Sequence, residues 1–141
     1  GRTSPVSKVF LDTNTILYAM DLGSPGKRGR SRALLQEAAE QRTGVISTQV
    51  MQDLFVAATR KLGADPLHVK EIIHGLTHFE VVAIGPALID EAIDCSILQR
   101  ISFWDALVVV AAESARCSEI WSEDLGAGQI IRGVKIVNPF S

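Results

Sequence analysis

Residues 9–20 read VFLDTNTILYAM, a short apolar run that stops abruptly at an acidic and polar cluster. A few apolar residues bounded by turn-forming side chains are typical of a strand that is buried inside a parallel sheet. Residues 15–20 then predict one or two helical turns directly after this strand. A buried strand that leads straight into a helix is the expected beginning of an α/β fold.

Outward from this segment, the chain alternates between apolar runs and helical patterns. Further strands are predicted at residues 45–46, 79–84, 120–121 and 134–137. Helices are predicted at residues 30–42, 48–62, 87–99 and 103–116, with another one opening at residues 65–66 and a glycine-rich loop at residues 21–29. Strands that alternate with helices predict a parallel sheet covered on both faces.

Two of these assignments depend on single features. Gly44 follows residues 30–42 and is a usual helix-terminating residue. Residues 108–110 are all valine, which also suits a buried strand. We expect a helix there, because Ser102 can cap it and alanines flank the valines.

The chain has 141 residues, of which 47% are hydrophobic and 21% charged. This length and composition predict one domain over residues 1–141, with residues 1–7 as a flexible or expression-derived extension. The net charge is −2, whereas proteins that bind nucleic acid by phosphate neutralisation alone are plainly basic. Any nucleic-acid role must therefore depend on a local basic patch or on a bridging metal ion.

Cys95 and Cys117 are the two cysteines of the chain. Isolated thiols in an apolar sequence are more typical of small buried side chains than of a disulfide, and they suit a reducing compartment. No secretory signal pattern is found at the N-terminus, and the longest apolar run, residues 106–112, is far too short to span a membrane. We therefore expect a cytoplasmic protein with no membrane association.

Four acidic residues carry the functional hypothesis. Asp12 and Asp124 follow predicted strands, Asp105 opens a predicted helix, and Asp53 lies at the edge of the buried face of another helix. Sites in parallel α/β sheets form beyond the carboxyl ends of the strands. Acids that converge there repel one another unless a cation binds between them, and hard oxygen ligands suit Mg²⁺ or Mn²⁺.

Each acid also has a purely structural interpretation. Asp12 can cap the helix that follows it, and Asp105 can form a capping pair with Ser102. Asp53 can be a solvated helix residue, and Asp124 can be a turn former. The metal-site hypothesis fails only if all four structural interpretations are correct at once. The joint pattern therefore favours a metal site.

The segments that carry these acids resemble the motifs of PIN-domain ribonucleases, particularly VapC-type toxins. Residues 9–19, 47–55, 101–107 and 122–129 are similar to the four motifs in order, and residues 134–140 to the last strand and tail. The resemblance covers nearly the whole chain. It implies a three-layer α/β/α sandwich around a five-stranded parallel sheet.

The same resemblance implies a metal-dependent endoribonuclease that uses Mg²⁺ or Mn²⁺, is inhibited by a cognate antitoxin protein and forms a homodimer. Carried over by position, Asp12, Asp105 and Asp124 are the metal-site acids. Asn14 and Ser122 are their polar support. From its place two residues after Asp12, Asn14 can either orient the Asp12 carboxylate by a hydrogen bond or serve as a local turn residue.

Asp53 departs from the pattern, since the second motif of the family generally carries Glu there. We count it as the fourth catalytic acid, although its shorter side chain reaches the metal only through water, or not at all. This departure supports an alternative function, a catalytically degenerate PIN-fold binding module.

A basic cluster follows the first motif, in the predicted loop and the start of the next helix. Its members are Lys27, Arg28, Arg30 and Arg32. The cluster is either a binding surface for the RNA substrate or a solvated face. Phe103 and Trp104 can stack on bases, but their place in an apolar helix favours core packing.

Two other classes of protein fit the sequence less well. A two-component receiver needs an acidic phosphoacceptor at the end of its middle strand, and residues 82–85 contain no acid. It also needs a lysine late in the chain, whereas Lys135 lies inside the predicted last strand. DNA-cutting PIN relatives usually carry longer insertions, for which 141 residues leave little room.

Overall fold

The first strand, β1 (Val9–Leu11), lies in the middle of the sheet and is buried on both faces. The computed structural model describes residues 7–141, so the expected extension at residues 1–7 falls almost entirely outside the described residues. The other strands are β2 (Gly44–Ser47), β3 (Glu80–Val82), β4 (Glu119–Trp121), β5 (Ile130–Ile131) and β6 (Val134–Val137). The order across the sheet is β3-β2-β1-β4-β6-β5.

The pairs formed among β1, β2, β3, β4 and β6 are all parallel, and Phe10 of β1 pairs with Val45 on one side and Ile120 on the other. The sheet has six strands, one more than predicted, because β5 pairs antiparallel with β6. The two residues between them, Arg132 and Gly133, have φ values of 50° and 79°. Positive φ at both positions is typical of the tightest hairpin turns.

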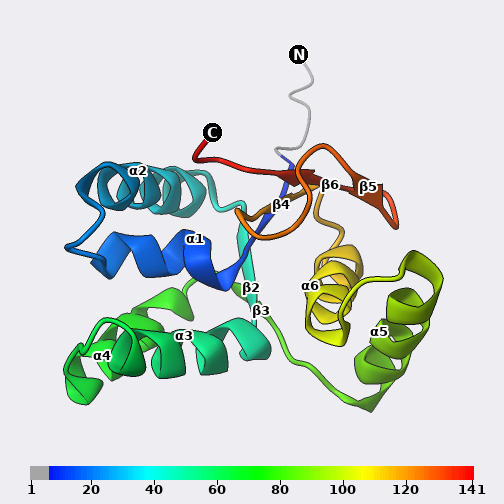
Figure 1. Cartoon of the computed structure of the whole chain (residues 1–141), viewed down its shortest axis with the longest axis horizontal. Helices are drawn as coiled ribbons and strands as arrows, with labels where there is room; N and C mark the ends of the chain where they lie inside the picture. The colour runs from blue at the N-terminus through cyan, green and yellow to red at the C-terminus, as the bar shows by residue number, and fades with distance from the viewer. Residues whose placement is uncertain (1–6) are drawn as a thin grey trace.

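Helices cover both faces of the sheet, as the α/β/α prediction requires. The helices are α1 (Thr13–Leu17), α2 (Pro25–Gln41), α3 (Thr48–Arg60), α4 (Pro66–Leu76), α5 (Pro86–Gln99) and α6 (Phe103–Ser114), with a 3₁₀ turn, η1 (Tyr18–Met20), after α1. In Figure 1, α1 to α4 lie on one side of the sheet and α5 and α6 on the other. The predicted α/β sandwich is confirmed.

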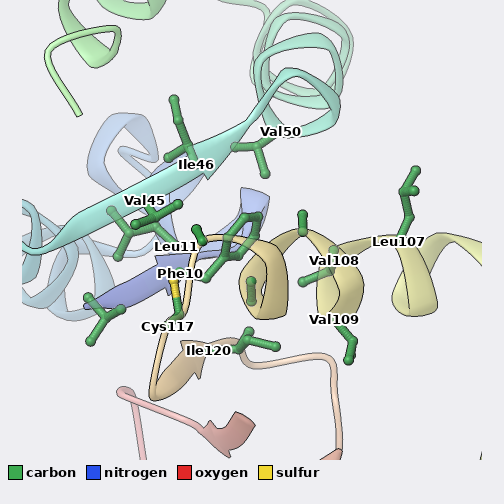
Figure 2. Close-up of a cluster of buried hydrophobic side chains, with 14 of the residues drawn as sticks. Phe10, Leu11, Val45, Ile46, Val50, Leu107, Val108, Val109, Cys117 and Ile120 are labelled. Carbon is green, nitrogen blue, oxygen red and sulfur yellow. The ribbon is translucent and has the colours of Figure 1, made fainter. Parts of the chain in front are cut away.

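Helix α6 is the centre of the core on its side of the sheet. Residues 106–112 are all buried, which confirms a helix at the three valines. Figure 2 shows Val109 of α6 among the core side chains around Phe10 and Ile120. Burying a side chain of this size contributes about 1.5–3 kcal/mol. These contacts therefore fix the position of α6 relative to the ends of the strands.

Helix α2 begins at Pro25 rather than at Arg30, so the predicted loop at residues 21–29 is too long. Proline fits the first turn of a helix because its missing N–H has no partner there in any case. The end of α2 also differs from the prediction, since Arg42 adopts the left-handed conformation with φ 56°.

Gly44 is the first residue of β2 rather than a helix terminator. An added Cβ at this position would lie 2.5 Å from Cδ1 of Phe79. The glycine is therefore required by a close approach of the Phe79 ring. The strand predicted at residues 79–84 is shorter than expected, because only Glu80–Val82 pair, at the partly exposed edge of the sheet.

Both cysteines are buried and free, as predicted. Among the described helices, none alone has the length and hydropathy needed to cross a membrane, and α5 and α6 together pass that test only as a pair bent by 117°.

Candidate active site

Asp12 lies at the carboxyl end of β1 and caps α1, since its Oδ1 accepts a hydrogen bond from the Thr13 backbone N–H at 2.8 Å. Its Oδ2 accepts from the Ser122 hydroxyl, also at 2.8 Å. Burial raises the pKa of the Asp12 carboxyl, the two hydrogen bonds lower it, and the charges of Asp124 and Asp105 raise it further. The predicted capping role of Asp12 is confirmed, and its role in a metal site stays a prediction.

Ser122 links the carboxyl ends of β1 and β4. It is fully buried, and its hydroxyl accepts from the backbone N–H groups of Asp124 and Leu125 at 3.2 Å each while donating to Asp12. The hydroxyl thus fixes the Asp12 carboxylate and the turn that carries Asp124. This hydrogen bond is compatible with the supporting role that the family resemblance implies for Ser122, which stays a prediction.

Asn14 holds Asp124 rather than Asp12. Its side-chain amide donates to Oδ2 of Asp124 across 110 residues of sequence. The prediction that Asn14 orients the neighbouring Asp12 is therefore wrong. An amide in the first turn of α1 can reach the turn after β4 because β1 and β4 are adjacent parallel strands.

Asp105 sits in the first turn of α6, where its backbone N–H donates to the Ser102 side chain at 3.1 Å. An acidic side chain is favourable at a helix N-terminus, so this position is stabilising as well as close to the site. Asp53 lies on α3 between the buried Val50 and Leu54, at the edge of the buried face as predicted. Burial raises the pKa of its carboxyl.

All four acids line one cavity of about 540 Å³, which we call the acid cavity. They come from four places in the chain: the end of β1, the middle of α3, the start of α6 and the turn after β4. Asn14 also lines it. The structure thus brings the predicted acids to one hollow, as convergence of the strand ends requires.

The donor set of the acid cavity is made of oxygens, which suits Mg²⁺ or Mn²⁺. Among residues 7–141, no three His, Cys, Asp or Glu side chains lie close enough together to hold an ion directly. Mg²⁺ commonly takes only one or two carboxylates and keeps several waters, so this spacing fits a largely hydrated ion. A cation in the cavity would also relieve the smaller repulsion that the charges of Asp124 and Asp105 exert on Asp12.

The acid cavity also contains residues that the sequence did not single out as site residues. Arg60 and Lys61, at the end of α3, line it, as do Gln49 and Trp104. Trp104 is 65% exposed, so the expectation that it packs in the core is wrong. A basic pair in the last turn of α3 was visible in the sequence, but only the fold places it beside the acids.

The predicted basic cluster lies on α2, and none of its four members is among the residues that line the acid cavity. Lys27 pairs with Glu123 at 2.7 Å. Arg30 and Arg32 donate to the backbone carbonyls of Pro139 and Ala19, each at 3.0 Å. Three of the four therefore make contacts within the chain, and the role of the cluster toward RNA stays a prediction.

The chain is similar to known proteins in its sequence pattern and in its fold. The model of the PIN domain family matches residues 9–130. No curated protein matches the chain in sequence. VapC20 of Mycobacterium tuberculosis, a toxin that cleaves the sarcin–ricin loop, is similar in structure with a TM-score of 0.65 and 17% identity, over 83% of this chain and 92% of that one.

Two complexes contain chains of the same fold. A toxin–antitoxin complex from Klebsiella pneumoniae gives a TM-score of 0.69 at 19% identity, over 94% of this chain and 98% of that one. DNA-bound VapBC from Salmonella typhimurium gives 0.64 at 19% identity, over 93% and 97%. At these identities the likeness establishes a common fold.

Proposed function

The chain belongs to the PIN domain family, and we propose that it is a metal-dependent endoribonuclease, the toxin of a bacterial toxin–antitoxin pair. The observation that carries this proposal is the acid cavity, in which four separate segments place Asp12, Asp53, Asp105 and Asp124 around one hollow. A cluster of carboxylates repels phosphate by itself, so a phosphodiesterase built on it needs a cation.

Asp12, Asp105 and Asp124 are the residues that would hold Mg²⁺ or Mn²⁺, and the bound ion supplies polarisation of the scissile phosphate and activation of a water. Ser122 and Asn14 hold two of these carboxylates by hydrogen bonds. Such support orients oxygen ligands before the ion arrives. Asp53, one methylene shorter than the usual glutamate, acts through a bridging water.

The substrate is RNA, cut by hydrolysis of a phosphodiester bond. We also propose a cognate antitoxin protein as partner, by analogy with the Klebsiella complex, together with the homodimer that the family resemblance favours. Expression of the chain alone should arrest growth, and co-expression of its antitoxin should relieve the arrest.

The direct test is cleavage of single-stranded RNA with Mn²⁺ or Mg²⁺. We expect the wild-type chain to cut, a chelator to stop it, and Asp12→Asn and Asp105→Asn to lose about 100-fold or more. Asp90→Asn is the matched control, because Asp90 is an exposed acid on α5 that does not line the acid cavity. Unchanged cleavage by Asp12→Asn, or in chelator, would refute the mechanism.

The second candidate is a degenerate PIN module that binds without cutting, and the aspartate at position 53 is the observation that favours it. Thermal unfolding with Mn²⁺ separates the two. An ion present at 100 times its dissociation constant stabilises the folded state by about 2.7 kcal/mol. We expect this stabilisation in the wild type and its loss in Asp105→Asn, whereas a module without a metal site gains nothing.

A further inference from the structure

A second cavity of about 300 Å³ adjoins the acid cavity, and we call it the side cavity. Gln49 and Trp104 line both cavities and so form the wall between them. The remaining lining of the side cavity includes the apolar side chains Ile84, Ile89, Phe103 and Leu107. A mainly apolar slot beside a hollow that would hold a cation suits a ligand that is flat and uncharged at one end and carries at the other an anionic group for the cation to bind.

The side chain of Trp104 presents an accessible aromatic surface. It is 65% exposed, although it lies in the first turn of a helix whose residues 106–112 are all buried. Phe103 packs against it with ring centroids 5.2 Å apart and planes at 77°, which steadies the indole and leaves most of it accessible. Stacking on an aromatic side chain is how proteins hold the bases of single-stranded nucleic acids.

Gln49 supplies an unused hydrogen-bond acceptor at the same wall. The residue is only 7% exposed, and among the described residues its Oε1 is the one buried side-chain nitrogen or oxygen without a partner. Its Nε2 donates to the Trp104 carbonyl at 3.4 Å, and the reverse assignment of the amide nitrogen and oxygen would set two oxygens against each other. A buried acceptor without a donor is unfavourable, so the site calls for an N–H group.

We propose that the side cavity is a nucleobase subsite, in which one base of the RNA stacks on Trp104 and donates an amine N–H to Oε1 of Gln49. The 3.4 Å hydrogen bond is long, so the amide can turn toward a better donor at little cost. Adenine, cytosine and guanine each present an exocyclic amine, whereas the Watson–Crick edge of uracil has two carbonyls around one N–H. The subsite therefore prefers an amino-bearing base, and this inference rests on the proposed ribonuclease function.

Fluorescence of Trp104 gives a direct test. The chain has two tryptophans, so the Trp121→Phe background leaves Trp104 as the only indole reporter. Adenosine, cytidine and uridine, which carry no phosphate for the acids to repel, are titrated in chelator so that bound metal does not change the signal. We expect adenine and cytosine ligands to quench the signal at lower concentration than uracil ligands.

Three variants separate stacking from hydrogen bonding, with homopolymer binding followed by fluorescence anisotropy of a dye on the RNA. Trp104→Ala should weaken binding of every homopolymer about tenfold, and Trp104→Phe should recover part of the loss. Gln49→Leu should remove the preference for adenine and cytosine. Phe55→Ala is the matched control, because Phe55 is a partly exposed aromatic of α3 that lines neither cavity.

The result that overturns the subsite is quenching by no nucleoside, or base preferences that are the same in Gln49→Leu and in the wild type. Circular dichroism of each variant excludes misfolding as the cause of a loss. These outcomes are independent of catalysis. If the wild type binds bases with the expected preference but cuts no RNA with Mn²⁺, the ribonuclease proposal fails while the subsite stands.

Discussion

Lys27 Nζ lies 2.7 Å from Oε2 of Glu123, an ion pair between the first turns of α2 and the turn that carries Asp124. Tyr18 donates its hydroxyl to the other carboxylate oxygen of Glu123, also at 2.7 Å, and its ring lies under the Lys27 ammonium group. Glu123, the residue next to Asp124, is therefore held by both Lys27 and Tyr18. The basic cluster that the sequence suggested for RNA binding thus has one member that positions the candidate site.

Replacing Lys27 by Met should lower RNA cleavage several-fold by loosening the turn that carries Asp124, while Tyr18 still holds Glu123. Arg28→Met is the control, because Arg28 makes no side-chain ion pair or hydrogen bond among the described residues. Cleavage rates and RNA binding are measured side by side. If both variants weaken RNA binding equally, Lys27 acts on the substrate and not on the turn.

The positions of the acids could be predicted because they depend on local signals. β1 is a short apolar run ending in Asp12, and parallel strands bring their carboxyl ends to one edge. The start of α2 could not be predicted, since Gly26 and Gly29 each disfavour a helix by about 1 kcal/mol relative to alanine. Contacts distant in sequence offset that cost, such as the bond from Arg30 to the Pro139 carbonyl.

Two other features, strand β5 and the exposure of Trp104, could not be predicted from the sequence for a different reason. β5 has two residues, too few for any periodicity, and it is defined only by its pairing with β6. The exposure of Trp104 depends on which side of α6 meets the sheet. The residues one helical turn further on, Leu107 and Val108, are both apolar, so this pattern does not distinguish a core tryptophan from one that lines a cavity.

Asp12→Asn should stabilise the metal-free protein at neutral pH. The pKa of Asp12 is raised in the folded state, so folding favours the protonated carboxyl, and the wild type loses stability as the pH rises from the ordinary Asp value of 3.8 through the raised pKa. Asparagine keeps an oxygen to cap α1 but carries no charge. Thermal unfolding between pH 3 and 8, roughly the range over which acids and histidines titrate, should show midpoints that diverge in favour of the variant as the pH increases.

The same measurement contains its own control. Below the ordinary Asp pKa the carboxyl is protonated in both states, so the two midpoints should then differ little. A variant that is less stable than the wild type at neutral pH would mean that the hydrogen bond from Ser122 outweighs the cost of burying the charge.

Ser122→Ala should destabilise the fold by about 1–3 kcal/mol, because it leaves the part-buried N–H group of Asp124 and the buried one of Leu125 without their acceptor. It should also raise the pKa of Asp12 further, since the Ser122 hydroxyl bonds the charged form. Ser114→Ala, at an exposed serine near the end of α6, is the matched substitution and should cost far less. Denaturant unfolding measures both, and equal losses would contradict the structural role of Ser122.

Arg60 and Lys61 should bind RNA phosphate at the end of the acid cavity opposite Gln49. From Gln49 to Arg60, α3 advances about 16 Å, so the helix carries the base-facing amide near its start and the two cations at its end. Neither cation forms an ion pair within the described residues. A strand of RNA lying along α3 would meet the cations on one side of the acids and the side cavity on the other.

The double substitution Arg60→Gln, Lys61→Gln should weaken RNA binding for all sequences alike. The slope of log affinity against log salt should fall by about 1.4, since each phosphate contact to a single strand contributes about 0.7. Lys135→Gln, at an exposed lysine on β6 outside the acid cavity, should leave the slope unchanged. If the slope instead falls on neutralising Arg28 and not Arg60 and Lys61, the strand crosses α2, and the basic cluster noticed in the sequence is the binding surface after all.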